Sequence, residues 1–310
     1  YEVILTNIIL NHREMFIKGA ITALVTPMKK DSSIEYESLK NLINHQISNG
    51  INGIVAVGTT GESATIDFED HIKLIEFFVK VTDNRVPIIA GTGANSTEEA
   101  LTLTKAAESI GADAALLVSP YYNKPPQEGI IQHHLKIADE ANIPQILYNV
   151  PSRTASFIEP STVSRLAKHE NIIGIKDATG DMKNLDDLKR LCSKEVNSNN
   201  FYFYSGDDFT SLEFLKLGGH GTISVSSNVV PKIVSEICEC FKNDFKKAEL
   251  LDSKLKDLNE NLFSESNPIP VKWALHKIGL IDKGIRLPLV ELSEEFKEPL
   301  EKCLIELDLI

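Results

Sequence analysis

The chain has 310 residues, of which 42% are hydrophobic, and a formal net charge of −12. A chain of this size and composition can bury a sizeable core, which excludes a disordered protein and a small disulfide scaffold. The acidic balance, with a pI near 5.2, excludes nucleic acid and anionic membrane surfaces as expected partners, because both require a basic surface. A small anionic substrate would need local cations or backbone donors.

The cysteine content points to a reducing compartment. The chain has four cysteines: Cys192, Cys238, Cys240 and Cys303. Their spacing matches neither a redox pair nor a zinc site, so we expect a cytoplasmic protein without a metal site. Residues 1–14 contain one interrupted apolar patch without a basic leader, and we expect an extension outside the fold, with Met15 as an alternative start. No apolar run reaches the roughly 18 residues of a membrane span.

Eight short apolar runs recur along the chain, at residues 20–27, 53–58, 86–93, 114–120, 144–150, 172–179, 201–207 and 221–227. Amphipathic segments separate them, and one of these opens with Ser96 and Glu99, a helix capping box. Apolar strands alternating with amphipathic helices indicate parallel strands buried on both faces. Eight such units predict an α/β fold, a (β/α)8 TIM barrel, rather than an open doubly wound sheet.

The last part of the chain has a different pattern. Residues 241–263 form a charged amphipathic segment without an apolar run, and two further helical segments follow, separated by a proline-marked turn near residue 288. We therefore predict a catalytic barrel over residues 15–240 and a C-terminal helical extension over residues 241–310.

Polar residues follow several of the predicted strands. In a TIM barrel the loops after the strand ends carry the chemistry. The predicted strand ends contain Thr59, Thr60, Tyr121, Tyr122, Tyr148, Arg153, Lys176 and Gly206. Hydroxyl groups, one amine and one guanidinium are therefore expected to meet on one face of the barrel.

Lys176 is the most unusual of these residues because it interrupts an apolar strand. Alternation of side chains places Ile173 and Ile175 on one face, and Gly174 and Lys176 on the other. If the isoleucines face the helices, Lys176 points into the barrel. Burial disfavours the charged form of an amine, which makes it a nucleophile able to form a Schiff base with a carbonyl carbon. The alternative is an ordinary lysine paired with Asp177 or another acid.

Two further residues fit the same chemistry. Tyr148 shares a face with Ile146 and Val150, so its phenol can also point inward, and together with Thr59 and Tyr122 it could relay protons. Arg153 could bind a carboxylate through its planar fork of donors. The alternatives are a tyrosine that only fills the core and a solvated loop arginine.

Two other patterns are weak. Gly91 and Gly93 lie between a predicted strand and helix, but the third glycine of a dinucleotide fingerprint is replaced by Ser96, and Asp113 precedes a strand where the ribose-binding acid should end one. The neighbouring His133 and His134 point in different directions on a helix, so they do not form a metal-binding pair.

Six motifs in succession resemble the dihydrodipicolinate synthase (4-hydroxy-tetrahydrodipicolinate synthase) family, within the pyruvate-dependent class I aldolase superfamily. They are GTTGESAT (58–65), SPYYNKPPQEG (119–129), YNVPSRT (148–154), GIKDATG (174–180), SGDD (205–208) and GGHGTISV (218–225). The resemblance runs from about Met15 to the C-terminus and includes ESNPIPVKWAL and RLPL in the C-terminal extension.

The resemblance implies a lyase of the diaminopimelate and lysine pathway in which Lys176 forms a Schiff base with pyruvate, and the enamine adds to L-aspartate 4-semialdehyde. It implies that Tyr148, Thr59 and Tyr122 relay protons, with Tyr122 reaching across a subunit interface, and that Arg153 holds the semialdehyde carboxylate. Thr60, Gly206 and the backbone at Ile223 would complete the pyruvate pocket. No cofactor is needed, because the lysine is the electron sink. A homotetramer built from two tight dimers is expected.

The same resemblance implies a lysine effector site at the dimer interface. The matching positions are Ser63, Ala64, His71, Asn95, Glu99 and Tyr121. Phe68 stands where lysine-sensitive relatives often have histidine, so feedback inhibition is an open question.

Two other functions compete with this interpretation. An N-acetylneuraminate lyase or a keto-sugar-acid aldolase shares the lysine, the tyrosine and a similar glycine-rich loop, and a fold cannot separate them. Thr59-Thr60 and Arg153 favour a short substrate with a second carboxylate. A non-catalytic effector-binding barrel is disfavoured, because a binding protein does not need an imine-forming amine.

Overall fold

The computed structural model describes residues 17–310. The extension expected at residues 1–14 and the alternative start at Met15 lie outside the described residues.

Eight parallel strands form a closed barrel, in which each strand pairs with its neighbours in the chain and β1 pairs with β8. The strands are β1 (Gly19–Ala23), β2 (Gly53–Ala56), β3 (Ile88–Gly91), β4 (Ala114–Val118), β5 (Gln145–Asn149), β6 (Ile172–Asp177), β7 (Tyr202–Ser205) and β8 (Gly221–Ser224). All eight predicted strands are confirmed, and so is the TIM barrel. Each strand is shorter than its apolar run, because the last residues of the run continue into the loop that follows.

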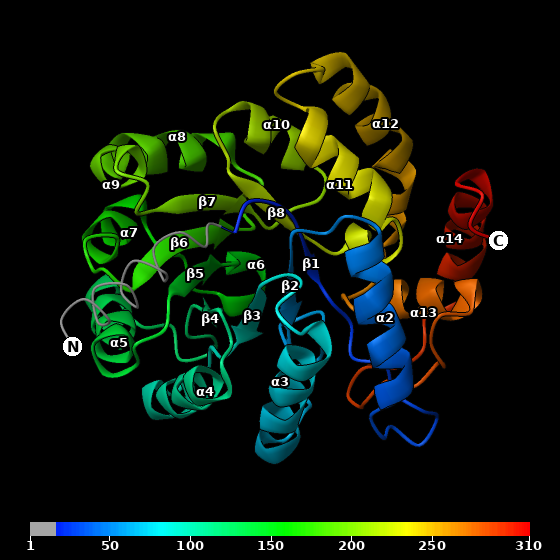
Figure 1. The fold of residues 1–310 in the computed structure, drawn as a ribbon, viewed down its shortest axis with the longest axis horizontal. Coiled ribbons are helices and arrows are strands. Elements are labelled where there is room, and N and C mark those ends of the chain that lie inside the picture. The colour runs from blue at the N-terminus through cyan, green and yellow to red at the C-terminus, as the bar shows by residue number, and fades with distance from the viewer. Residues whose placement is uncertain (1–16) are drawn as a thin grey trace.

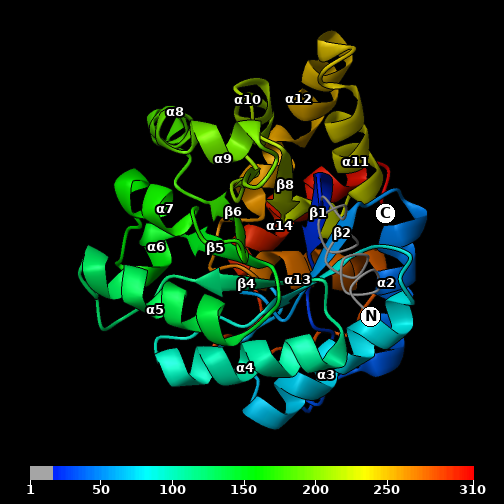
Figure 2. The ribbon, with the colours of Figure 1, turned by 60° about the vertical axis from the view of Figure 1, so that its left-hand side comes forward.

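Helices surround the barrel (Figure 1). They are α2 (Tyr36–Ser48), α3 (Phe68–Thr82), α4 (Thr97–Ile110), α5 (Gln127–Glu140), α6 (Pro151–Thr154), α7 (Pro160–Leu166), α8 (Met182–Leu191), α9 (Ser193–Asn197), α10 (Ser211–Lys216), the 3-10 turn η1 (Ser226–Asn228) and α11 (Pro231–Cys240). Successive helices pack side by side, as Figure 2 shows for α3, α4 and α5. At the start of α4 the Ser96 side chain accepts a hydrogen bond from the Glu99 backbone at 3.4 Å, as the capping box predicts.

The two faces of the strands contribute to different apolar clusters. One cluster inside the barrel is built almost entirely from strand residues, among them Ile21, Val55, Ile146 and Tyr148. Two outer clusters combine the other face of the strands with the helices. Because side chains alternate along a strand, a residue that follows the interior pattern near a strand's C-terminal end points toward the mouth of the barrel.

The alternation predicted for β6 is right at Ile175 and wrong at Ile173. Ile175 lies in an outer cluster with residues of α8, whereas Ile173 packs against the interior cluster. The register between β5 and β6 shifts at this point, since Gln145 pairs with Ile172 but Ile146 pairs with Gly174. Ile173 is therefore the extra residue of a bulge, which breaks the strict alternation that the sequence suggests.

Three helices follow the barrel on one side of the molecule: α12 (Phe245–Asn261), α13 (Ile269–Ile278) and α14 (Glu294–Glu306) (Figure 1). Their apolar residues, such as Leu258 and Leu275, belong to the same cluster as Leu39 of α2 and Phe78 of α3. The helical C-terminal extension thus shares its core with the barrel helices, and the domain boundary after residue 240 stays a prediction. Within residues 17–310 we find no helix with the length and apolar character that a membrane crossing requires.

Candidate active site

Lys176 and Tyr148 face each other near the C-terminal ends of β6 and β5. The two residues are register partners, and the Lys176 Nζ lies 4.4 Å from the centroid of the Tyr148 ring. Both side chains are buried, with 5% and 6% of their surface exposed. An amine over an aromatic face is a cation–π contact. Among residues 17–310 the Lys176 amine makes no hydrogen bond or ion pair, so it remains available to a ligand.

The alternative of an ion pair between Lys176 and Asp177 does not hold. The Asp177 carboxylate accepts hydrogen bonds from Asn149, Thr179 and Asn184 at 2.8–3.0 Å. Burial raises the pKa of Asp177, and these three hydrogen bonds act in the opposite direction. The side chains of Lys176 and Asp177 therefore lie on different faces of β6.

A glycine makes room for the lysine. Gly206 follows β7, and a Cβ at this position would lie 2.8 Å from Lys176 Cε and 2.8 Å from Ala178 Cβ. Its backbone N–H donates a hydrogen bond to the Asp177 carbonyl at 2.7 Å, which holds the two strand ends together. Ile223 of β8 is 1% exposed and belongs to the interior cluster. Gly206 thus packs directly on the amine-bearing side chain, as a pocket residue should.

The loop after β2 carries Thr59 and Thr60. Thr59 is half-buried, whereas Thr60 is 2% exposed and its hydroxyl accepts a hydrogen bond from the Asn267 side-chain amide at 2.9 Å. The Thr26 hydroxyl donates a hydrogen bond to the Gly61 carbonyl at 2.7 Å and joins the same loop to the loop after β1.

Arg153 lies in α6, directly after β5, with an exposed side chain. Its Nη2 donates a hydrogen bond to the Asn267 backbone carbonyl at 3.2 Å. Thr60 and Arg153 come from different strand ends, and one residue of the C-terminal extension contacts both.

The predicted proton relay is not joined by hydrogen bonds. Among the residues that the structure describes, the hydroxyls of Thr59, Tyr122 and Tyr148 have no hydrogen-bond partner. Tyr122 is 89% exposed and adopts a left-handed backbone conformation with φ of 72°. Its ring therefore projects away from this chain, and its place in the relay stays a prediction.

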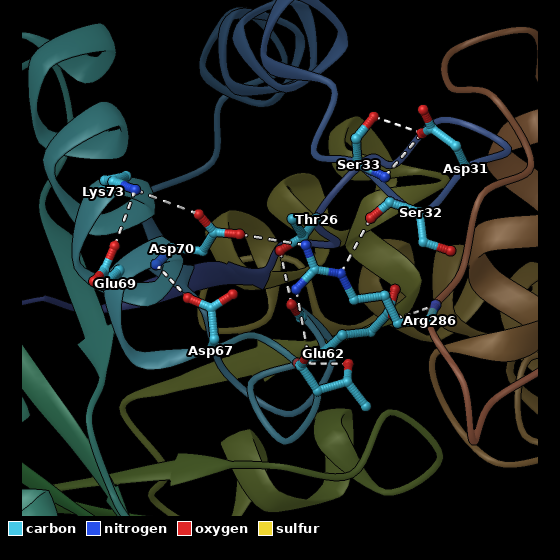
Figure 3. A network of polar contacts seen from close by, with 12 residues as sticks. Thr26, Asp31, Ser32, Ser33, Glu62, Asp67, Glu69, Asp70, Lys73 and Arg286 are labelled. Atoms are coloured by element: carbon cyan, nitrogen blue, oxygen red, sulfur yellow. Dashed lines mark hydrogen bonds and ion pairs between the residues drawn. The ribbon is translucent and has the colours of Figure 1, made fainter.

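A polar network that was not predicted from the sequence joins the loop after β2 to the C-terminal extension (Figure 3). Glu62 forms a buried ion pair with Lys272 of α13 and also accepts a hydrogen bond from the Arg286 backbone at 3.1 Å. The Arg286 guanidinium donates to the Ser32 and Thr65 carbonyls and to the Asp70 carboxylate. The sequence signals were the presence of GTTGESAT, ESNPIPVKWAL and RLPL among the family motifs, without a role for their charged residues.

Comparisons with known proteins identify the family of this chain. The model of the "Dihydrodipicolinate synthetase family" matches residues 16–307. The chain belongs to this family. The 4-hydroxy-tetrahydrodipicolinate synthase of Alcanivorax borkumensis is 51% identical over 292 residues, which cover 93% of this chain and 98% of the relative. The interpretation of the chain as an enzyme of this family, a lyase of the class I aldolase type, is thereby confirmed.

Solved structures of the dihydrodipicolinate synthetase family share the fold. The chloride-inhibited dihydrodipicolinate synthase from Acinetobacter baumannii, complexed with pyruvate, has a TM-score of 0.92 and 50% identity, covering 95% of this chain and 100% of that chain. The enzyme from Cyanidioschyzon merolae, solved with lysine bound, has a TM-score of 0.90 and 36% identity, covering 96% of this chain and 100% of that chain.

The residues of the predicted effector site come from three neighbouring loops and helices. Ser63 and Ala64 follow β2, His71 lies in α3, Asn95 and Glu99 flank the start of α4, and Tyr121 follows β4. The loops are linked, because the Asn123 amide donates to the Asn95 carbonyl at 2.8 Å. Burial, and to a lesser extent the charge of Glu99, raise the pKa of Tyr121.

Two members of this set are notable. The His71 ring is 5% exposed and forms a hydrogen bond through Nε2 with the Gly91 carbonyl at 2.7 Å. Only the other ring nitrogen, Nδ1, would therefore be available to a ligand. Phe68, which stands where lysine-sensitive relatives often have histidine, is 43% exposed at the start of α3.

The two weak patterns have structural explanations. The Asp113 carboxylate accepts a hydrogen bond from the Ile88 backbone at 2.7 Å, at the N-terminal end of β3 and away from the strand ends that form the site. His133 and His134 are buried in α5, and their rings pack edge to face with centroids 4.9 Å apart. His133 Nδ1 bonds to the Thr97 hydroxyl at 2.9 Å.

Proposed function

We propose that the chain is a 4-hydroxy-tetrahydrodipicolinate synthase, which condenses pyruvate with L-aspartate 4-semialdehyde in the first committed step of lysine biosynthesis through diaminopimelate. The observation that carries this proposal is the buried Lys176 amine over the Tyr148 ring, with no competing partner among residues 17–310. The family and the full-length relatives named for this activity support it.

The first step forms a bond between the Lys176 Nζ and the C2 carbonyl carbon of pyruvate. Loss of water converts the resulting carbinolamine into an imine, and each proton must move between nitrogen, oxygen and a nearby acid or base. The Tyr148 ring packs against the amine, with its centroid 4.4 Å from the Lys176 Nζ. Its hydroxyl is therefore the proposed proton carrier for this step.

The second step uses the imine as an electron sink. Removal of a proton from the pyruvate methyl group gives an enamine, whose carbon attacks the aldehyde of the semialdehyde and forms a carbon–carbon bond. The amino group of the second substrate then attacks the imine carbon, closes the ring and releases Lys176. No external cofactor is needed, because every electron pair moves within the substrates and the lysine.

Two groups are proposed to hold the carboxylates. Thr60, Gly206 and the backbone at Ile223 would bind the pyruvate end, and Arg153 would bind the semialdehyde carboxylate. Arg153 is exposed at the strand ends, where a guanidinium offsets the overall charge of −12 for an approaching anion.

A homotetramer in the cytoplasm is part of the proposal. Tyr122, at 89% exposure, and its neighbour Tyr121, at 37%, present aromatic surface beside the loops that carry the site. Exposed aromatic side chains are enriched in subunit interfaces. We propose that Tyr122 completes the relay of a partner subunit. Sedimentation analysis of the wild type and Tyr122→Ala tests the assembly, and the initial rates of the same two proteins test the relay.

Lysine is the proposed effector at Ser63, Ala64, His71, Asn95, Glu99 and Tyr121. The enzyme of Cyanidioschyzon merolae was solved with lysine bound, which supports a test with this chain. Titration with lysine up to millimolar concentrations should lower the initial rate. An unchanged rate would show that the effector assignment is wrong. A Phe68→His variant would then test whether the phenylalanine is what prevents inhibition by lysine.

Trapping the imine is the decisive experiment. Incubation with pyruvate and borohydride, followed by peptide mass mapping, should reduce one pyruvate adduct onto Lys176. Lys272 is an internal control, because it is also buried but is paired with Glu62. Labelling elsewhere, or an unmodified Lys176, would overturn the mechanism.

The second substrate separates the proposal from a sugar-acid lyase. A coupled assay should show condensation with aspartate semialdehyde and none with N-acetylmannosamine. The opposite preference would assign the chain to the rival activity while keeping the Schiff base.

A further inference from the structure

Asn267 joins two groups that the proposed function assigns to different substrates. Its side-chain Nδ2 donates a hydrogen bond to the Thr60 hydroxyl at 2.9 Å, and its backbone carbonyl accepts one from Arg153 Nη2 at 3.2 Å. Asn267 lies two residues before the start of α13, at 6% exposure, and is far from both partners in the sequence. One residue of the C-terminal extension thus touches the loop after β2 and the helix after β5.

The direction of the first hydrogen bond decides what the Thr60 hydroxyl can do. The amide nitrogen is a donor, so the hydroxyl oxygen acts as the acceptor and its own proton stays free. Among residues 17–310 no other group accepts that proton. A hydroxyl held in this way is prepared to donate to an anionic oxygen, such as that of a pyruvate carboxylate.

The position of Asn267 is fixed by the contacts on either side of it. Lys272, in the next helix, forms the buried ion pair with Glu62, only two residues beyond Thr60. The Ile269 backbone donates to the Ser266 carbonyl at 2.9 Å across the turn that contains Asn267. The ion pair therefore joins α13 to the loop after β2 beside the hydrogen bond between Asn267 and Thr60.

We propose that Asn267 is a positioning residue with two separable effects: its side chain directs the Thr60 hydroxyl toward pyruvate, and its backbone carbonyl holds Arg153 for the semialdehyde. This inference rests on the proposed function. A substitution at Asn267 removes the side-chain effect alone, since the backbone carbonyl remains.

The test measures both Michaelis constants in the Asn267→Asp variant. The new side chain keeps the shape of asparagine but accepts the Thr60 proton instead of donating to the oxygen. We expect KM for pyruvate to rise about tenfold, which corresponds to the loss of one hydrogen bond to a charged group, while KM for aspartate semialdehyde stays within about twofold. Asn261→Asp in α12 is the matched control, because the Asn261 amide contacts Asp257 and Cys303 and no site residue.

A double-mutant cycle identifies the route of the effect. Thr60→Val should raise KM for pyruvate similarly, and the Asn267→Asp, Thr60→Val double variant should be no worse than Thr60→Val alone. Additive effects would overturn the inference, and so would an equal rise of both Michaelis constants, which indicates local unfolding. Asn267→Ser, whose side chain is too short to reach Thr60, serves the same purpose if the Asp variant does not fold. An inactive wild type would instead refute the proposed function.

Discussion

Glu62 and Lys272 form an ion pair, closed off from solvent, that joins the loop after β2 to α13. Their side chains are 0% and 4% exposed. Burial lowers the pKa of Lys272, and the charge of Glu62 acts in the opposite direction. A buried charge without a partner is costly, so removal of either residue leaves the other in an unfavourable position. The pair also explains how a helix at the end of the chain is fixed beside the candidate active site.

Breaking this pair on one side should destabilise the protein strongly. Lys272→Met leaves Glu62 buried without its counter-charge, and we expect a loss of about 3–5 kcal/mol in the free energy of unfolding. Glu62→Gln combined with Lys272→Met removes both charges and should recover most of that loss. Urea unfolding followed by circular dichroism measures the difference.

The control for this pair is an exposed one. Lys40 and Glu37 lie 3.9 Å apart with side chains 51% and 70% exposed, and Lys40→Met should change the free energy of unfolding by less than about 1 kcal/mol. If the double variant is as unstable as Lys272→Met alone, the uncompensated charge is not the cause.

Gly206→Ala should impair Schiff-base formation without a large change in fold. The new methyl group would lie 2.8 Å from Lys176 Cε, so the lysine side chain must move away from its position over Tyr148. A displacement of about 1 Å can cost about a hundredfold in rate. The rate of borohydride trapping with pyruvate measures this directly. In Gly129→Ala the methyl group meets only proline side chains, at 3.3 Å or more, and trapping should be unchanged.

The barrel and the centre of the site could be predicted because both depend on local patterns. Apolar runs of strand length predict which segments form the strands of the barrel. Alternation of side chains along β5 then predicts that Tyr148 lies inside the barrel, as it does. The strand register then brings Tyr148 beside Lys176. In β6 the same argument failed at Ile173, because a bulge depends on how neighbouring strands fit and leaves no trace in the alternation.

The contacts of the C-terminal extension could not be predicted in the same way. Asn267 and Lys272 contact Thr60 and Glu62, which lie more than 200 positions earlier in the chain. Such contacts depend on where α13 packs, and amphipathic periodicity tells which face of a helix is buried but not against what. Lys272 even resembles an ordinary solvated lysine in the sequence, because its partner is not nearby along the chain.

The buried histidines predict how stability depends on pH. Burial lowers the pKa of His133 to about 4, whereas the unfolded chain should titrate near 6.5. Between these values the unfolded state binds a proton that the folded state does not, so the free energy of unfolding falls as the pH falls. One such group contributes about 1.4 kcal/mol per pH unit. At pH values above 6.5 its contribution is complete and constant.

The variant His133→Gln isolates this contribution. Urea unfolding at several pH values from 7.5 to 4.5 gives the free energy of unfolding as a function of pH. In the variant this free energy should fall less steeply with falling pH than in the wild type, and the difference in slope should correspond to about one bound proton. Other buried histidines, such as His134 and His220, have lowered pKa values too and keep the remaining slope. An unchanged slope in the variant would mean that the pKa of His133 is the same in the folded and the unfolded protein.

Tyr148→Phe separates the two contributions that this residue makes beside Lys176. The phenylalanine ring preserves the aromatic face over which the amine lies, but the hydroxyl that could carry protons is lost. Because general acid–base catalysis typically contributes about 10²–10⁴-fold, kcat should fall by at least about a hundredfold. Borohydride should still trap pyruvate on Lys176, more slowly, whereas Lys176→Met should show no trapping at all. A kcat within about twofold of the wild type would assign Tyr148 a packing role only, and the protons of the imine would then have to travel through Thr59 or solvent.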